Sequence, residues 1–245
     1  MKAPLILLRD GVHWLLVSDD GKNQLYRHPT DPLRSLSVID PDYTFQPCDA
    51  DDCLQEYYPN GNYGTAINIS TNPRTSYRRR AILKFDLTSQ IGAGSTVNSA
   101  TLSLYYYAYT GNPVGRTIWA YRIMQTGWTE AGSSWDHYVG TTHWAAAGGD
   151  YTTTNGASAT VPAAAGWMAW TVTTQIQTAI DSVGRIAHFL MRDGTESGST
   201  DYQAHFYSRD YAVDMTKRPK LYVDWTAAPV APTVTTQAAT GLGLD

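Results

Sequence analysis

Alternation of apolar and polar positions is the dominant pattern along most of the chain. Between positions 80 and 87, Ala81, Leu83, Phe85 and Leu87 fall on one side, and Ile82 falls with the polar residues on the other. A period of two residues is typical of a β-strand that buries one face. The same kind of pattern predicts further strands at residues 100–110, 117–124, 187–193, 204–210 and 220–225.

Tyrosines alternate with apolar residues in one of these predicted strands. One face carries Leu102, Leu104 and Tyr106, and the other face carries Tyr105, Tyr107 and Tyr109. Because leucine is buried more readily than tyrosine, we expect Tyr105, Tyr107 and Tyr109 to lie on the more solvent-exposed face. A row of rings with hydroxyl edges suits a sugar or a neighbouring subunit. Packing of the row under a covering loop is the alternative, and the pattern leaves it open.

One segment has a helical period instead. The apolar positions 172, 176 and 180 are spaced four residues apart, as on one face of an α-helix. We expect Thr173 or Thr174 to cap the start of this helix and Gly184 to end it. Clusters of Gly, Asn and Ser separate the predicted strands at the spacing of a β-sandwich. The pattern therefore predicts an all-β, antiparallel sandwich with one short helix.

The first 44 residues differ, because their apolar residues occupy both faces of the predicted strands. Asp10-Gly11 between two apolar runs predicts a β-hairpin, and residues 26–34 predict an irregular connector. A lone hairpin is marginal in water, and about 40 residues cannot build a core. We therefore expect this extension to join another copy of the chain by adding a strand to its sheet. The residues predicted to make this assembly contact are Leu5, Ile6, Leu7, Leu8, Val12, Trp14 and Leu16.

Three parts of the chain follow from these patterns. Residues 1–44 are the N-terminal extension and residues 45–226 the β-sandwich. Residues 227–245 are rich in Ala, Thr and Pro, which is typical of a linker. Residues 232–240 fit the start of another strand, which leaves open that a further domain begins there.

Composition narrows the classes of partner. The 245 residues carry a formal net charge of -4, which gives no electrostatic case for binding nucleic acid. No apolar run reaches the roughly 18 residues that span a membrane. The apolar run near the start is too short for a secretory signal. A removed signal, unconventional export and release of a virion by lysis all stay open, and we expect an extracellular, cell-surface or virion-surface protein.

The two cysteines, Cys48 and Cys53, enclose Asp49, Asp51 and Asp52. In an oxidising environment such a close pair forms a local disulfide, which we predict. Zinc is disfavoured, because it needs about four ligands and no histidine is close in sequence. The three aspartates offer the hard oxygen ligands that Ca²⁺ requires. A structural calcium ion and a solvated acidic turn are the two interpretations left open.

Arg78 begins the one run of arginines in the chain. Such a run is usually a solvated loop, but Arg78 is also a candidate contact to a glycan or to a neighbouring copy. No catalytic motif is evident, because the histidines are scattered and neither HExxH nor GxSxG occurs. Glu130 and Asp136 are the nearest to a carboxylate pair, and the tryptophans beside them favour a role in loop anchoring. We therefore expect no enzyme and no cofactor other than the calcium ion considered above.

Short motifs occur along the chain in an order that one family shares. Asn62-Tyr63-Gly64-Thr65 is followed by the strand at 80–87, by W-T-E…W at 128–136, by a G-G-D-Y loop at 148–151 and by closing strands at 206–210 and 218–225. Taken together, these motifs resemble the DNRLRE domain family over residues 45–226. Thr171 departs from the pattern, since the family has Asp there.

The resemblance implies a jelly-roll-like β-sandwich, as found on bacterial, archaeal and phage surface proteins, some of which bind polysaccharide. It places Trp128, Trp135 and Trp144 in the core. Our first hypothesis is a surface-exposed structural protein that self-associates, into a filament where the donated strand does not close a ring. The alternative is a carbohydrate-binding module of a larger extracellular or phage fibre protein. It rests on the resemblance and on the tyrosine row.

Overall fold

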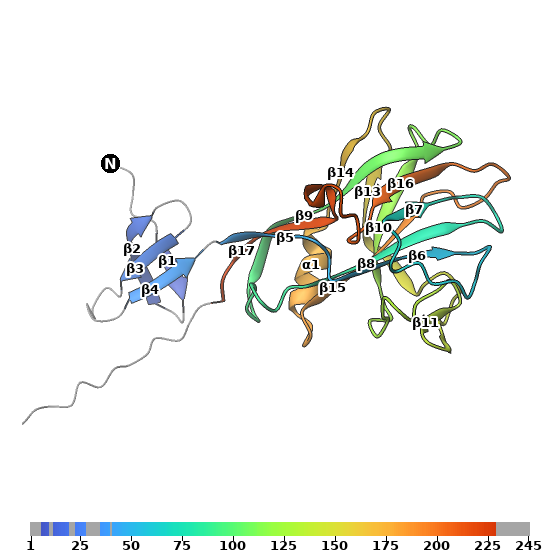
Figure 1. Cartoon of the computed structure of the whole chain (residues 1–245). Coiled ribbons are helices and arrows are strands. Elements are labelled where there is room, and N and C mark those ends of the chain that lie inside the picture. Colours follow the sequence, from blue (N-terminus) through green and yellow to red (C-terminus); the bar gives the residue numbers. More distant parts are fainter. Residues whose placement is uncertain (1–5, 10–11, 20–22, 28–34, 40, 229–245) are drawn as a thin grey trace, which may run out of the picture. The chain divides into compact units, whose positions relative to one another are not determined.

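The computed structural model describes residues 6–9, 12–19, 23–27, 35–39 and 41–228. Two compact units divide the chain: Asp42–Trp225 is one, and Met1–Pro41 with Thr226–Asp245 is the other. Figure 1 shows the helices and strands of both units.

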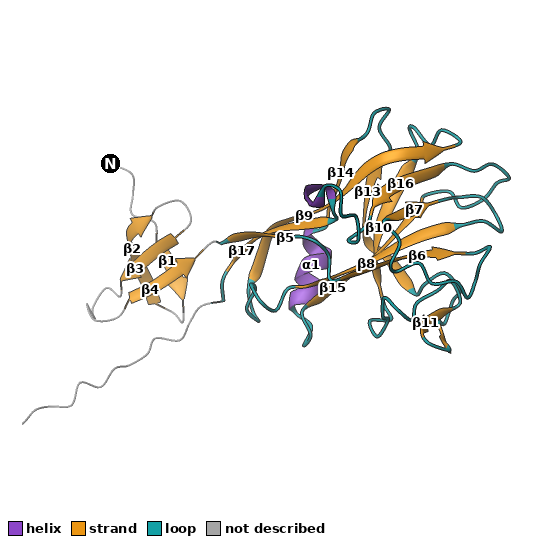
Figure 2. Ribbon diagram, viewed as in Figure 1, coloured by secondary structure: helices purple, strands orange, loops and turns teal. Residues whose placement is uncertain are grey.

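Two antiparallel sheets build the larger unit, as Figure 2 shows, and the predicted all-β sandwich is confirmed. The five-stranded sheet contains, in spatial order, β13 (Tyr151–Thr160), β10 (Thr117–Ile123), β15 (Ile186–Asp193), β8 (Arg79–Asp86) and β6 (Ala50–Gln55). The six-stranded sheet contains β5 (Asp42–Phe45), β17 (Lys220–Thr226), β9 (Thr96–Thr110), β16 (Gln203–Tyr207) and β7 (Asn68–Thr71), with β14 (Gly166–Thr171) paired to β9. A small ladder joins β11 (His137–Val139) and β12 (Thr142–His143).

Apolar side chains fill the space between the two sheets. Leu83 and Phe85 of β8 are fully buried there, as alternation predicts. A second apolar cluster lies on β6, β8 and β15, where Ile82 and Leu190 contact residues of the segment that follows β10. That segment supplies the buried rings of Trp128, Trp135 and Trp144, so their predicted burial is confirmed. The cluster also explains why Ile82 is apolar on the side of β8 where polar residues alternate.

Helix α1 (Thr173–Ile180) confirms the helical period. Its N-cap is Val172, which makes no side-chain capping bond, so the predicted threonine cap is wrong. Thr173 Oγ1 instead accepts a hydrogen bond from the main-chain NH of Ala100 at 3.1 Å. The C-cap is Asp181, before the predicted end at Gly184. A 3₁₀ turn, η1 (Met215–Lys217), precedes β17. No helix in the described part of the chain is long and apolar enough to span a membrane.

The smaller unit contains a four-stranded antiparallel sheet in the order β1 (Ile6–Arg9), β2 (Val12–Asp19), β3 (Asn23–Arg27) and β4 (Ser35–Ile39). The predicted hairpin is confirmed, because β1 and β2 pair with Arg9 opposite Val12. The expectation of a lone hairpin is wrong, since β3 and β4 extend the sheet and β3 includes the first residues of the predicted connector. Leu5, residues 28–34 and residues 229–245 lie outside the described residues.

Candidate functional site

The outer face of the six-stranded sheet carries two of the predicted tyrosines. Leu102, Leu104 and Tyr106 are buried, at most 1% exposed. Tyr105 and Tyr107, which alternate with them, are half-buried. The predicted sidedness of β9 is therefore confirmed for these two rings.

Tyr109 leaves this row, and the prediction that it shares their face is wrong. The pairing of β9 with β16 shifts by one residue at Tyr107, and a bulge of this kind moves all later side chains to the opposite face. Tyr109 is therefore paired with Ala204, which is fully buried. Directly paired residues point to the same side, so Tyr109 lies on the inner side, where it is 53% exposed.

Five aromatic residues form what we call the tyrosine surface: Tyr105, Tyr107, Trp167, Tyr207 and Tyr211. Tyr207 stacks on Tyr107 with ring centroids 4.2 Å apart and on Tyr211 at 3.6 Å. Trp167 meets Tyr105 edge to face at 5.4 Å. Because the stacked rings cover one another's faces, the tyrosine surface offers hydroxyl edges more than flat rings. It is therefore suited to hydrogen bonding along its length.

Two lysines lie against this surface. The Lys217 ammonium is 4.9 Å from the centroid of the Tyr105 ring, and that of Lys220 is 4.0 Å from the Trp167 ring. Cation–π contacts of this length hold the ammonium groups in place. They add hydrogen-bond donors to a face whose rings are otherwise neutral.

A polar pocket of about 260 Å³ lies at the start of β16, whereas the tyrosine surface includes Tyr207 at the end of that strand. It is lined by Gln55, Tyr57, Tyr58, Asn72, Arg74, Tyr77, Arg79, Asp201 and Gln203. Most of these side chains come from the segments around β7 and from the segment before β16. The pocket thus combines aromatic rings with charged and amide groups, as ligand sites with a few fixed polar contacts do.

Contacts within the pocket hold its walls in place. The Tyr57 and Tyr77 rings stack 4.5 Å apart, and the Arg74 guanidinium lies 4.1 Å from the Tyr77 ring centroid. Arg74 also pairs with Asp201 at 2.8 Å, and Asn72 Nδ2 donates to Asp201 at 2.7 Å. Burial acts to raise the pKa of Asp201, but the hydrogen bonds from Asn72 and Arg74 outweigh it and lower that pKa. The Asp201 carboxylate is therefore charged and fixed at neutral pH.

Strand β16 connects the pocket to the tyrosine surface. Gln203, His205 and Tyr207 alternate along the strand and share its outer side. Gln203 lines the pocket, and the His205 ring lies 6.2 Å from that of Tyr107. Burial, with a contribution from Arg79, lowers the pKa of His205. These side chains make one continuous path of about 13 Å along the strand.

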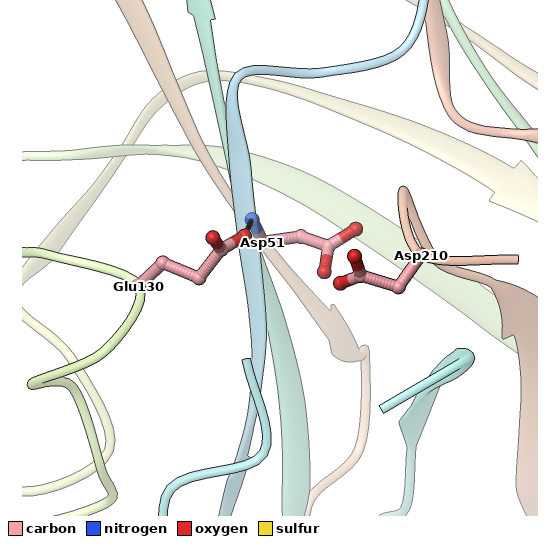
Figure 3. A group of neighbouring side chains, drawn as sticks. All are labelled: Asp51, Glu130 and Asp210. Carbon is pink, nitrogen blue, oxygen red and sulfur yellow. Dashed lines mark hydrogen bonds between the residues drawn. The ribbon is translucent and has the colours of Figure 1, made fainter. Parts of the chain in front are cut away.

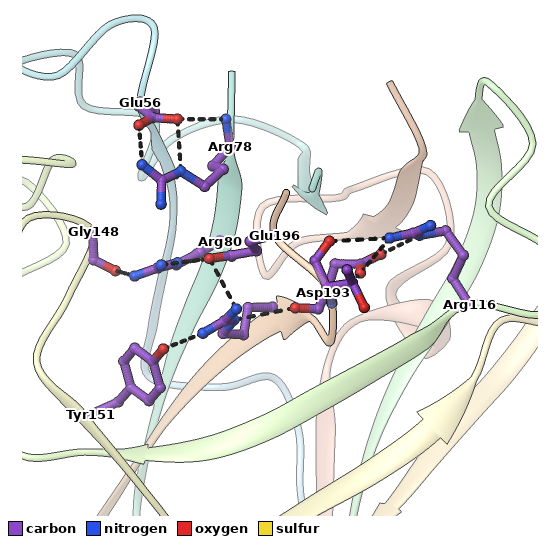
Figure 4. A network of polar contacts seen from close by, with 10 residues as sticks. Glu56, Arg78, Arg80, Arg116, Gly148, Tyr151, Asp193 and Glu196 are labelled. Atoms are coloured by element: carbon purple, nitrogen blue, oxygen red, sulfur yellow. Dashed lines mark hydrogen bonds and ion pairs between the residues drawn. The ribbon is translucent and has the colours of Figure 1, made fainter. Parts of the chain in front are cut away.

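Arg78 does not reach this path. Its guanidinium pairs with Glu56, with Nε donating to Oε2 at 2.8 Å. The predicted solvated basic run is wrong, because Arg80 is only 6% exposed and pairs with Glu196 at 2.6 Å (Figure 4). Arg79, between the two, lines the polar pocket instead.

The predicted disulfide is absent from the structure, because Cys48 and Cys53 are both free and buried. Cys48 Sγ lies 3.5 Å from Asp51 Oδ2, and Cys53 Sγ lies 3.6 Å from Ser70 Oγ. The extended strand from Ala50 to Cys53 alone covers about 10 Å. A disulfide joins Cα atoms at most about 7 Å apart, so strand formation at this point works against the bridge.

The three aspartates between the cysteines do not converge, so they do not together form the calcium site that was one interpretation of the sequence. Asp49 Oδ2 accepts from the main-chain NH of Asp86 at 2.6 Å. Asp52 accepts from the main-chain NH of Tyr63 at 2.9 Å and from Ser133 Oγ at 2.7 Å. Burial raises the pKa of Asp52 to about 6. Asp51 instead accepts from the main-chain NH of Arg209 at 2.7 Å.

Sequence reasoning missed most of the pocket. Tyr57, Tyr77 and Arg74 lie outside strands, where no period marks them. The sequence pattern could have identified Tyr207, because it predicts a strand at residues 204–210 and alternation puts His205 and Tyr207 on one face of that strand.

Comparison with known proteins supports a binding role. The family model described as carbohydrate-binding module family 96 matches residues 42–224, which is nearly the whole sandwich. Comparison with curated proteins gives no match. The match covers almost the same residues as the resemblance to DNRLRE domains. It supports the carbohydrate binding that this resemblance implies, whereas membership of the DNRLRE family stays a prediction. Because the match spans well over half of the chain, the chain belongs to carbohydrate-binding module family 96.

Proposed function

We propose that the sandwich binds a polysaccharide strand along the outer face of the six-stranded sheet, with the polar pocket and the tyrosine surface as its two ends. The observation that carries this proposal is the outward row Gln203, His205 and Tyr207, which joins the pocket to the stacked rings. A linear chain of sugar rings matches a linear path of this kind.

The chemistry of the two ends suits sugars. Tyr57 is 53% exposed, so it can stack on the apolar face of a sugar ring. Arg74 and Asp201 supply charge-assisted hydrogen bonds to hydroxyl groups, and their mutual contact fixes their positions in advance. Along the tyrosine surface, the hydroxyl edges give and accept hydrogen bonds at successive sugars.

The test uses the full chain on a glycan array, followed by affinity electrophoresis in the soluble polysaccharide that scores highest. Tyr57→Ala and Arg74→Ala are expected to weaken binding about tenfold or more, since central contacts are worth about 1–2 kcal/mol each. Both side chains are part-exposed, so the melting temperature is expected to change little.

A matched control comes from the other sheet. Tyr121 of β10 stacks between Trp119 at 5.5 Å and Tyr151 at 5.2 Å. Tyr121→Ala therefore removes an aromatic ring from the five-stranded sheet and not from the sheet that carries the proposed path. Binding by this variant should equal that of the wild type. Loss of binding in Tyr121→Ala with unchanged binding in Tyr57→Ala and Arg74→Ala would place the site on the five-stranded sheet and reject the proposal.

On this proposal, the chain acts outside the cell, and it binds polysaccharide without catalysing a reaction. Membership of a family of carbohydrate-binding modules supports both points. Self-association stays a second proposal. The observation favouring it is that β1 and β4 form the two edges of an open sheet, and sheet edges are templates for pairing with another chain.

A further inference from the structure

Three carboxylates from separate segments meet at the start of β6. Asp51 lies in that strand, Glu130 in the segment after β10, and Asp210 just beyond β16. One oxygen of each lies within 4.8 Å of the others. Figure 3 shows the carboxylates of Asp51 and Asp210 pointing toward each other, with Glu130 on the other side of Asp51.

One carboxylate oxygen of Asp51 lacks a hydrogen-bond partner among the described residues. Its side chain is fully buried, at 0% exposure. Oδ2 accepts from the main-chain NH of Arg209 at 2.7 Å and contacts Cys48 Sγ at 3.5 Å. Oδ1 has no hydrogen-bond partner among the described residues. A buried carboxylate oxygen without a partner is costly, and native proteins rarely leave one unsatisfied.

The nearest cation does not satisfy Asp51. The Arg209 side chain lies 3.4 Å from both carboxylate oxygens of Glu130 and also donates to the main-chain oxygen of Asp49. Glu130 in turn accepts from the main-chain NH of Asp51 at 3.0 Å. When all three acids are ionised, one guanidinium leaves the cluster with two uncompensated negative charges.

We propose that Asp51, Glu130 and Asp210 bind one divalent cation, with calcium as the preferred ion. Carboxylate oxygens are the ligands that Ca²⁺ favours, and its flexible coordination accepts three side chains completed by water. The cation would give Asp51 Oδ1 its missing partner and balance the two excess charges. It would also tie together three segments that are distant in sequence, beside the turn at residues 62–65.

Zinc fits this cluster poorly. Its three ligand-bearing side chains are all carboxylates. The cluster contains no histidine, and zinc sites favour nitrogen and sulfur ligands.

The experiment titrates CaCl₂ into the full chain after EDTA treatment and dialysis, by calorimetry and by thermal melting. We expect one ion per chain and a rise in melting temperature, because an ion that binds only the native state stabilises it. Asp210→Asn should weaken calcium binding at least tenfold. Asp210 is exposed, so this variant is expected to fold.

Asp181→Asn is the matched control, since Asp181 is an exposed aspartate at the end of α1. It should bind calcium as the wild type does. Absence of saturable binding by the wild type, or equal binding by Asp210→Asn, would overturn the proposal. Binding of MgCl₂ as tight as that of CaCl₂ would overturn the preference for calcium.

Discussion

Single buried polar residues fix the segments between strands to the sheets. Arg80 pairs with Glu196 and donates to the main-chain oxygen of Gly148 at 2.8 Å, which ties β8 to the loop before β13. His188, only 5% exposed, accepts a hydrogen bond from Trp128 Nε1 at 3.0 Å. Each such contact joins positions that are far apart in sequence, so the pattern along the chain does not reveal the partner.

His188 gives a pH dependence of known sign. Burial, with a contribution from Lys84, lowers its pKa to about 4. The unfolded chain binds a proton near pH 6.5, but the folded protein does so only near pH 4. Stability is therefore fully present above pH 6.5 and is lost as pH falls toward 4, by about 3 kcal/mol from this group.

The measurement is urea denaturation of the wild type and His188→Asn at pH 7, 5.5 and 4. The Asn side chain keeps an acceptor for Trp128 but does not titrate, so the variant should lose less stability on acidification. Other acids titrate equally in both proteins and cancel in the comparison. Identical pH profiles for the two proteins would contradict the expected role of His188.

At the scale of elements, the turn at residues 62–65 requires a glycine for a reason of packing. The φ angle of Gly64 is not positive, so the turn does not need the left-handed conformation there. A Cβ atom on Gly64 would lie 2.7 Å from both Cγ and the main-chain oxygen of Glu130. Gly64 is needed because Glu130 packs directly on its backbone.

Gly64→Ala is expected to destabilise the sandwich by about 1–3 kcal/mol, as overpacking against a fixed carbonyl does. Gly166→Ala is the matched control, because a Cβ there meets no atom within 4 Å, and it should change stability by less than about 0.5 kcal/mol. Chemical denaturation measures both. If Gly64→Ala proves as stable as the wild type, Glu130 moves aside freely and the packing argument fails.

The elements found from sequence are those with a clear period. Residues 80–87 and 100–110 alternate and are strands β8 and β9, and the four-residue spacing marks α1. Strand β6 shows no such period, because Asp51 and Asp52 are buried in it with partners from other segments. The bulge at Tyr107 was not predictable from β9, since the pairing with β16 determines it. Of the five residues of the tyrosine surface, the sequence therefore indicated Tyr105 and Tyr107, and it indicated almost none of the pocket.

At the scale of the whole molecule, the unit Asp42–Trp225 coincides with the family match. Its two sheets share one core, and β5 at its start pairs with β17 at its end. The three-part division expected from sequence placed the boundary at residue 45, within β5. These observations favour a sandwich that folds without the four-stranded sheet that precedes it.

A chain limited to residues 42–228 is therefore expected to be folded and monomeric, and to bind polysaccharide as tightly as the full chain. Near-ultraviolet circular dichroism, light scattering after size exclusion and affinity electrophoresis measure the three properties. If the full chain self-associates through residues 1–41, only the full chain should form larger species. Equal assembly by the shortened chain would remove that role from the N-terminal sheet.

The alternation along β16 also bears on protein engineering. Ala204 and Phe206 are fully buried, whereas Gln203, His205 and Tyr207 are half-buried and lie beside the proposed ligand path. Randomising the second set leaves the first unchanged, so a combinatorial library at these positions would sample new specificities on an intact scaffold. Selection from such a library would then act on recognition and not on folding.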